Sequence, residues 1–310
     1  MAVTPVIPAK GASKPGHLPR ARNKAWWVPY LFLAIPLAMF LIWVIGPMIY
    51  SFYLSLTNWD GVSAPKFIGM RNYIRLLNDR IFWISIANNA KWVVAFITGP
   101  VIMGLALAMV LNRDIPGAKG IKSAFYSPYI IAPVVIGLIW GWMYQPANGL
   151  FNSILRAVGV ENPPGWLADP RLATWCIIAA AIWRQVGYVM TLYLAGLQGV
   201  DPSLIDASMV DGANPWQTFR HVIWPLLSPV TVVVVVISII DSLRSFDMVF
   251  VMTRGGPANS SSVLANMMYI EAFNNYKMGY GAAIAVVLFL ISAGFIFVYL
   301  WQTLRTELEY

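Results

Sequence analysis

The stretch MGYGAAIAVVLFLISAGFIFVYLW, residues 278–301, contains no charged side chain. A helix needs about 20 consecutive apolar residues to cross the hydrocarbon core of a bilayer. Residues 278–301 meet that length, so they predict a membrane-spanning helix. This segment sets the expected fold class, an all-α membrane protein.

Further apolar segments of sufficient length precede this one, which brings the expected number of transmembrane helices to about six. They are residues 27–54, 86–111, 124–144, 174–197 and 230–252. The composition agrees, because 59% of the residues are hydrophobic and only 11% are charged. A soluble domain carries about 25% charged residues. A chain with so little polar surface cannot cover a water-soluble globule of this size.

The formal net charge is +8 at pH 7. The basic residues are scattered among apolar spans, which argues against nucleic-acid binding and is typical of cations that flank membrane helices. Five lysine or arginine residues precede the first span. Together with an even number of spans, they predict a multi-pass protein of the cytoplasmic membrane with both termini in the cytoplasm. The first outer loop is basic as well, so this orientation depends on the N-terminal segment.

Three regions follow from this pattern. Residues 1–25 are rich in Pro, Ala, Gly and Lys and are expected to form a disordered, basic cytoplasmic tail. Residues 26–305 form the expected transmembrane domain, and 306–310 form a cytoplasmic C-terminal tail. Amphipathic pieces at 72–79 and 151–158, within long outer loops, predict short helices at the membrane surface or against a partner.

The sequence carries no pattern of residues for catalysis or metal binding. Cys176 is the single cysteine, and the two histidines, His17 and His221, share no ligand spacing. No P-loop, HExxH or GxSxG sequence is present. We therefore expect a protein that is not an enzyme, binds no cofactor itself and draws energy from a partner.

The loop between the fourth and fifth spans reads VDPSLIDASMVDGANPWQTFRHVIWP, residues 200–225. Asp201 followed by Pro202 predicts a helix N-terminus, and Gly212 suits the left-handed residue that closes the helix. Asn214 with Gln217 forms the pattern of a capping box, which predicts a second helix ending at Pro225. Apolar residues at helical spacing indicate a helix pair that docks into another protein's groove. They are Leu204, Ile205, Met209, Trp216 and Phe219.

This loop resembles the EAA loop of the permease subunits of ATP-binding cassette (ABC) importers, a Glu-Ala-Ala, Asp-Gly-Ala and Ile-x-Leu-Pro pattern. The matching residues are Asp206, Ala207, Ser208, Asp211, Gly212, Ala213 and Pro225. The sequence departs from the pattern with Asp206 for Glu, Ser208 for Ala, Val222 for Ile and Trp224 for Leu. By this resemblance, the loop is the cytoplasmic coupling helix that contacts an ATPase.

A second resemblance narrows the family. Thr253-Arg-Gly-Gly-Pro257, preceded by Phe246-Asp247, is similar to the Thr-x-Gly-Gly-Pro signature of sugar permeases of the maltose-transporter first-subunit class. Ala195-Gly-Leu-Gln198 also fits, and the similarity covers about residues 27–305. The resemblance implies type I importer architecture in a bacterial inner membrane.

It also implies the partners. A second permease would complete the pore, two ATPase subunits holding ATP and Mg would drive it, and an extracytoplasmic solute-binding protein would deliver a sugar. The coupling helix then acts as a lever that transmits the closure of the ATPases.

In the maltose-type relatives, the sugar site lies between the fourth and fifth spans. The positions that match it are Arg184, Gln185, Tyr188, Ser238, Ser242 and Ser245. Tyr, Gln and Ser suit hydroxyl-rich ligands, whereas an arginine suits a carboxylate, phosphate or sulfonate. One hypothesis is therefore an anionic sugar or polyol derivative.

The alternative is structural. Arg244 lies three residues from both Asp241 and Asp247, so the fifth span could satisfy its own charges as helical pairs. Arg184 could also pair with one of these carboxylates. Trp140, Trp142 and Trp183 could stack on a sugar, but interfacial or core packing accounts for them as well.

Two other classes of protein fit the sequence less well than a permease. An ion-coupled secondary transporter needs inverted repeats with broken spans in corresponding places, and the sequence shows no such halves. A membrane enzyme needs a converging set of catalytic groups, which the sequence lacks.

Overall fold

The computed structural model of the chain describes residues 27–113 and 115–307. These residues are mostly helical, and the only strands among them, β1 (Thr57–Asn58) and β2 (Lys66–Phe67), form one antiparallel pair. The expected all-α fold class is confirmed. The tail expected at 1–25 lies outside the described residues, and so do 308–310.

The chain separates into two compact units, residues 1–48 and 49–310. In the first unit, the described helices are α1 (Val28–Phe40), the π-helical turn η1 (Leu41–Ile45) and the start of α2 (Gly46–Ser55). Tyr30–Ser55 is long and apolar enough to cross a membrane, and its most apolar window buries no side chain within the structure. This stretch corresponds to the predicted first span.

The second unit holds the remaining helices. Three of them are long: α4 (Arg80–Leu111), α8 (Ala173–Gln198) and α15 (Met278–Glu307). Five are of intermediate length: α5 (Ala118–Ile130), α6 (Pro133–Met143), α7 (Leu150–Ala157), α9 (Pro202–Val210) and α12 (Ser228–Leu243). The short elements are α3 (Arg71–Leu77), α10 (Pro215–Thr218), η2 (Phe219–Ile223), α11 (Trp224–Leu226), α13 (Phe246–Met252), α14 (Leu264–Tyr269) and η3 (Ile270–Asn274).

By length and composition, four helices of the described chain can cross a membrane, or six if each of two bent pairs counts as one span. The second, fourth and sixth predicted spans correspond to α4, α8 and α15. The short helices predicted around 72–79 and 151–158 are present as α3 and α7.

The third and fifth predicted spans are not single helices. Residues 124–144 divide into α5 and α6, which meet at an angle of 100°. Pro133 causes this break, because the residue before a proline avoids the helical conformation, and Ala132 is extended with ψ 138°. Residues 230–252 divide into α12 and α13 at Arg244 and Ser245, where no proline or glycine stands.

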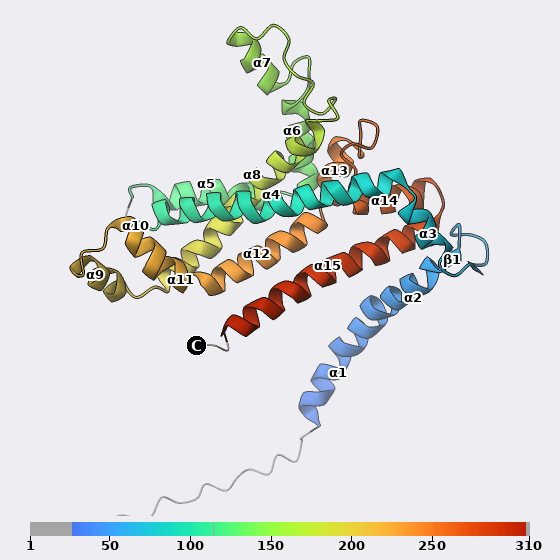
Figure 1. Ribbon diagram of the computed structural model, residues 1–310, viewed down its shortest axis with the longest axis horizontal. Helices are drawn as coiled ribbons and strands as arrows, with labels where there is room; N and C mark the ends of the chain where they lie inside the picture. The colour runs from blue at the N-terminus through green and yellow to red at the C-terminus, as the bar shows by residue number, and fades with distance from the viewer. Residues whose placement is uncertain (1–26, 114, 308–310) are drawn as a thin grey trace, which may run out of the picture. The chain divides into compact units, whose positions relative to one another are not determined.

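Within the second unit, α4 packs along α8, and α12 packs on α4. At one end of these helices lie α9, α10 and α11, and at the opposite end lie α3, α13 and α14 (Figure 1). The α4–α8 interface is tight, because a Cβ on Gly104 would come 2.6 Å from a Val189 methyl group. A buried apolar cluster around Leu105, Val189 and Tyr193 fills the end near α9.

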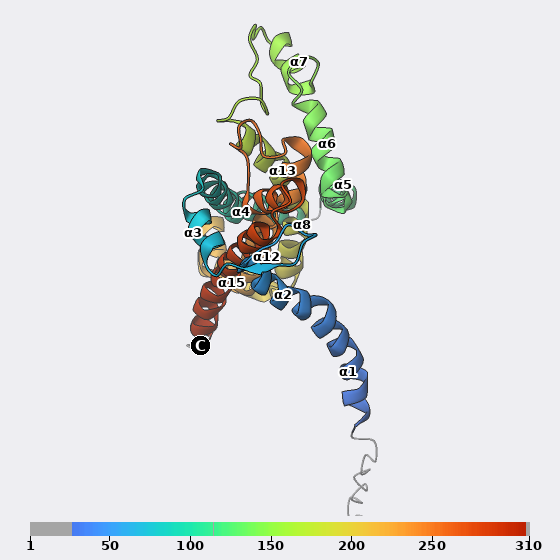
Figure 2. The same ribbon diagram turned by 90° about the vertical axis from the view of Figure 1, so that its right-hand side faces the viewer.

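The helix α6 packs on α13 and α8 and carries α7 at its far end. Figures 1 and 2 both show α7 extending away from α12 and α15. The loop around α7 is held by Asn152, whose Nδ2 donates to the carbonyls of Pro146 and Pro164, while its Oδ1 accepts from the indole of Trp166. The projecting segment is therefore an ordered part of the fold.

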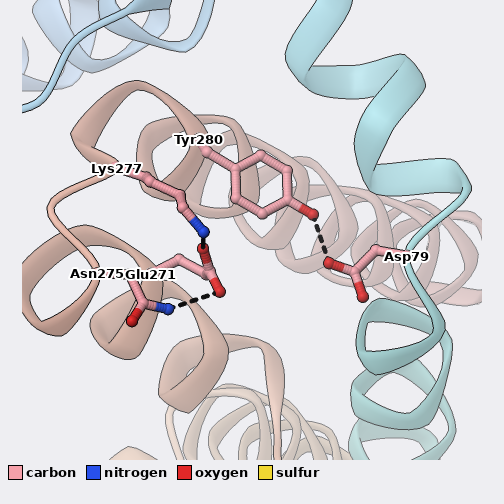
Figure 3. A network of polar contacts seen from close by, with 5 residues as sticks. All are labelled: Asp79, Glu271, Asn275, Lys277 and Tyr280. Atoms are coloured by element: carbon pink, nitrogen blue, oxygen red, sulfur yellow. Dashed lines mark hydrogen bonds and ion pairs between the residues drawn. The ribbon is translucent and has the colours of Figure 1, made fainter.

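A polar cluster joins the start of α15 to the start of α4 (Figure 3). The Tyr280 hydroxyl donates to Asp79 over 2.8 Å, and Asp79 also caps α4 by accepting from the Ile81 N–H. The Arg75 guanidinium lies 4.3 Å from the centroid of the Tyr280 ring. Lys277 forms an ion pair of 3.1 Å with Glu271 nearby. These contacts fix the two helix starts to each other.

Gly187 on α8 provides a test of the α5–α8 packing, because a Cβ there would overlap the Phe125 backbone carbonyl of α5. We expect Gly187→Leu to lower the melting temperature of the detergent-solubilised protein, since overpacking costs about 1–3 kcal/mol. Gly141→Leu is the matched control, because no atom lies within 4 Å of its added Cβ. Equal melting temperatures for the two variants would contradict this packing.

Candidate functional site

The first helix of the 200–225 loop is capped at both ends as predicted. The Ser203 N–H donates to Asp201 Oδ1 over 2.9 Å, with Pro202 at the start of α9. This hydrogen bond holds the pKa of Asp201 below its usual 3.8, so the cap is charged at neutral pH. At the other end, Gly212 has φ +82°, and the Gly212 and Ala213 N–H groups donate to Met209 and Ser208. That pattern is a Schellman motif.

The second helix begins with the predicted capping box. The Gln217 N–H donates to the Asn214 side chain over 2.9 Å, and the Asn214 N–H donates to the Gln217 side chain over 2.8 Å. This helix ends at Leu226, one residue beyond the predicted Pro225, and the chain then turns by 70° into α12. The π-helical turn η2 shifts the hydrogen-bond register just before Pro225, which accommodates a residue that has no N–H.

A polar contact joins the two short helices. Ser208 Oγ donates to the Ile205 carbonyl over 2.7 Å and lies 3.0 Å from the hydroxyl of Thr218, which is buried. Around this contact, Asp206, Ala207, Asp211, Gly212 and Pro225 are exposed, whereas Ser208 and Ala213 are partly buried.

Much of the apolar surface of this helix pair is uncovered. Val210 is 87% exposed, and large side chains on both helices share this exposure. They are Leu204, Met209, Trp216 and Trp224. Ile205 and Phe219, which were also predicted as anchors, are partly buried. An uncovered apolar cluster of this kind on a capped helix pair is typical of surfaces that bind another protein.

The other candidate site is a cavity of about 280 Å³ beside the break between α5 and α6. Four charged residues line it, namely Arg184 from α8 and Asp241, Arg244 and Asp247 from the region of the α12–α13 break. The remaining lining residues are aromatic, apolar or neutral: Trp92, Phe96, Tyr129, Pro133, Ala181, Gln185, Ser245 and Met248. Two helix breaks therefore border the same cavity.

Three of the six predicted sugar-facing residues line this cavity, namely Arg184, Gln185 and Ser245. The other three lie outside its lining. Tyr188 stacks on Tyr129 with ring centroids 4.4 Å apart. Ser242 donates to the Ile239 carbonyl over 2.7 Å, and Ser238 is fully buried.

The charged residues are arranged differently from the expected helical pairs. Gln185 Nε2 donates to Asp241 Oδ2 over 2.8 Å. Arg184 donates to two backbone carbonyls, those of Tyr129 and Ile131, rather than to a carboxylate. Because the helix breaks at Arg244, this residue and Asp247 do not share a continuous helix face. Among the described residues, no ion pair within 4.0 Å includes Arg244.

Sequence reasoning missed the contributions of α4 and α5 to the cavity, those of Trp92, Phe96 and Tyr129. Aromatic residues in apolar spans give no local signal that separates a cavity wall from a helix interface. The charged residues of the fifth span were noticed, but they were interpreted as partners for one another.

The Thr253–Pro257 segment is anchored by side-chain hydrogen bonds and by a close packing contact at Gly255. Thr253 Oγ1 lies 2.8 Å from Ser261 Oγ, and Gly255 has φ +89°, with Asn266 only 2.6 Å from where a Cβ would stand. Asn88 on α4 donates to the carbonyls of Ser260 and Ser262. A side chain at position 255 would be strained by the left-handed backbone and would displace Asn266, which accounts for the first glycine of the motif.

Comparison with known proteins identifies the class. Residues 24–306 match the family described as binding-protein-dependent transport system inner membrane component. The chain belongs to this family and is a membrane-embedded transport subunit rather than an enzyme. The predicted resemblance to ABC-importer permeases of the sugar type is confirmed.

The individual relatives are as follows. The chain is 35% identical to a probable permease protein, AmyD, of a starch degradation products transport system of Thermoanaerobacterium thermosulfurigenes, over 93% of this chain and 97% of that one. It is 33% identical to the trehalose/maltose transport system permease protein MalF of Thermococcus litoralis, over 87% and 92%. Its fold is similar to that of a chain in a bacterial alginate ABC transporter structure, with a TM-score of 0.81 at 20% identity, covering 90% and 95%.

The capping box makes a testable contribution to the α9–α11 segment. Asn214→Ala removes the acceptor for the Gln217 N–H, and loss of such a cap costs about 1 kcal/mol. We expect hydrogen exchange at Gln217 and Thr218 to accelerate about fivefold, the factor that corresponds to this cost. Asn214→Ser is the control because serine also caps. Unchanged exchange in Asn214→Ala would show that the cap does not hold the helix.

Proposed function

We propose that this chain is one permease subunit of an ATP-driven importer for a sugar or sugar derivative. It forms the translocation pore with a second permease and couples to two ATPase subunits through the α9–α11 segment. An extracytoplasmic solute-binding protein delivers the substrate. The observation that carries this proposal is the α9–α11 segment, which combines capped helix ends with an uncovered apolar surface.

The sugar substrate is supported by two features. The relatives at 33% and 35% identity are named for trehalose or maltose and for starch degradation products. The cavity offers this class of ligand aromatic surfaces at Trp92 and Tyr129 and polar groups at Gln185 and Ser245. A sugar fits such a lining, because its ring can pack on the aromatic faces while its hydroxyl groups form hydrogen bonds with the polar side chains.

An anionic sugar is the second candidate, and the observation that favours it is Arg244. This residue is exposed, lines the cavity and has no carboxylate within 4.0 Å among the described residues. Asp241 and Asp247 line the same cavity, and their negative charges would repel an anionic substrate. Arg244, rather than Arg184, is therefore the residue whose replacement tests for an anionic substrate.

The localisation follows the family. The chain is a multi-pass protein of the inner membrane. We place both termini and the α9–α11 segment in the cytoplasm, because five basic residues precede the first span and because ATP is cytoplasmic. The chain itself binds no cofactor in this proposal, since ATP and Mg are held by the partner ATPases.

The assembly is tested by purifying the tagged chain in mild detergent from its native membrane and identifying the proteins that co-purify. We expect an ATPase subunit and a second permease. The complex is then reconstituted with its binding protein, and its ATP hydrolysis is measured with each of two sugars. Faster hydrolysis with a neutral oligosaccharide indicates a neutral substrate, and faster hydrolysis with a uronic-acid sugar indicates an anionic one. Recovery of the chain alone from several detergents, with uptake driven by an ion gradient, would refute the proposal.

Gly212 tests the coupling role of the α9–α11 segment. Gly212→Asp should reduce ATP-dependent uptake at least tenfold while the chain remains in the membrane, because it adds a charge to an exposed surface and a Cβ at φ +82°. Gly212→Asn is the control for charge. Aspartate and asparagine both tolerate the left-handed conformation better than most residues, so the added charge is the main difference between the two variants. Normal uptake by Gly212→Asp would count against the coupling role.

A further inference from the structure

The break after α5 leaves backbone carbonyls near Ile130 without helical partners. In an α-helix, the carbonyl of a residue accepts from the N–H four positions later. For Tyr129 that position is Pro133, which has no N–H. The Ile131 carbonyl lies at the break itself, where the chain is extended with ψ 137°. Away from water, both carbonyls need a donor from elsewhere in the protein.

Arg184 on α8 supplies both donors. Its Nη2 donates to the Tyr129 carbonyl over 3.1 Å, and its Nε donates to the Ile131 carbonyl over 3.3 Å. Its guanidinium also lies over the Tyr129 ring, 4.8 Å from the centroid. Hydrogen bonds from a charged donor are stronger than neutral ones, and the planar guanidinium can reach two acceptors at once.

Neighbouring residues of α8 hold the same end of α5. Tyr188 stacks on Tyr129 at an angle of 9° between the ring planes. Gly187 allows the α5 backbone at Phe125 to approach so closely that a side chain would not fit. Arg184, Gly187 and Tyr188 therefore form one cradle for the last turn of α5, and Arg184 contacts the point where the helix stops.

A second proline of α5 is treated in the same way. Pro128 cannot donate to the carbonyl of Ala124, and the Ser127 hydroxyl donates to that carbonyl over 3.0 Å. At both prolines, a side-chain donor replaces the missing backbone donor. The difference is that Ser127 belongs to α5 itself, whereas Arg184 comes from another helix and thereby joins the two.

We propose that Arg184 is a positioning residue: it fixes the 100° break between α5 and α6, and with it the cavity wall formed by Tyr129 and Pro133, instead of binding a negative charge on the substrate. The effect of Arg184 on transport rests on the proposed function, whereas its effect on the fold does not. The test therefore measures both the stability of the fold and the transport of sugars.

The fold readout is a double-mutant cycle on melting temperature in detergent, using Arg184→Met and Pro133→Ala. Alanine at position 133 supplies a backbone N–H and no longer keeps Ala132 out of the helical conformation, so α5 can continue through the break and satisfy the Tyr129 carbonyl itself when Arg184 is absent. Pro133→Ala should therefore raise the melting temperature more in the Arg184→Met background than in the wild type. Arg184→Lys should retain only part of the stability, because an ammonium keeps the charge but not the planar fork that reaches both carbonyls. Arg71→Met, at an exposed arginine of α3, is the control for loss of a charge.

Additive effects in this cycle would overturn the proposal. If Arg184→Met alone yields no folded protein, recovery of folded protein by adding Pro133→Ala supports the proposal, and failure to recover it overturns it. These measurements use no substrate, so they stand whatever the transporter carries.

The transport readout compares a neutral and a uronic-acid sugar in the reconstituted complex. We expect Arg184→Met to lower the maximal rate at least tenfold for whichever sugars are carried, with no selective change in KM. A tenfold rise in KM for the anionic sugar alone would make Arg184 a substrate ligand and would overturn the proposal. A wild-type complex that carries no sugar would refute the proposed function and leave the double-mutant cycle to decide the role of Arg184.

Discussion

Inside a bilayer, a backbone carbonyl that loses its helical N–H partner has no water to replace it, and the arrangement of this protein around its cavity follows from that constraint. Two described membrane helices of the second unit contain an internal proline, Pro100 in α4 and Pro128 in α5, each of which frees a carbonyl, and α5 also ends just before Pro133. On α5 the freed carbonyls accept from Ser127 and Arg184. At the α5–α6 break, a residue of another helix supplies the donor, and that residue is Arg184 of α8 beside the cavity.

In the α9–α11 segment, the backbone groups at the helix ends also need hydrogen-bond partners, but they find them differently. There the helix ends are satisfied within the segment itself, by Asp201, by the Asn214–Gln217 capping box and by the left-handed Gly212. Such local caps leave the segment's outward surface free, because they consume no donor from α4 or α8. The segment is consequently ordered without being covered, which is the condition for binding a partner as a rigid element.

The contrast between caps made within one segment and contacts made between distant helices explains which features could be predicted from the sequence. The caps of α9 and α10 were predictable, since each depends on residues within four positions of one another. The apolar spans were predictable from hydropathy, but hydropathy does not register the 100° bend, because Pro133 stands inside a uniformly apolar stretch. The break at Arg244 and Ser245 has no proline or glycine to announce it.

The cavity was the least predictable feature. Its lining comes from α4, α5, α8 and the α12–α13 region, so it depends on how distant segments pack. Arg184 was correctly placed at the cavity, but its partners were not foreseen. They are backbone carbonyls, and a carbonyl freed by a proline on another helix leaves no trace in the side-chain pattern around Arg184.

The two breaks that border the cavity are held unequally. The α5–α6 break has the Arg184 cap, whereas at the α12–α13 break Arg244 is exposed and the buried Ser245 hydroxyl has no hydrogen-bond partner among the described residues. The less constrained break stands at the end of α12, and α12 follows directly from α11 across the 70° turn. A displacement of the α9–α11 segment would reach the cavity along α12, which the Gln185–Asp241 hydrogen bond joins to α8 just before this break.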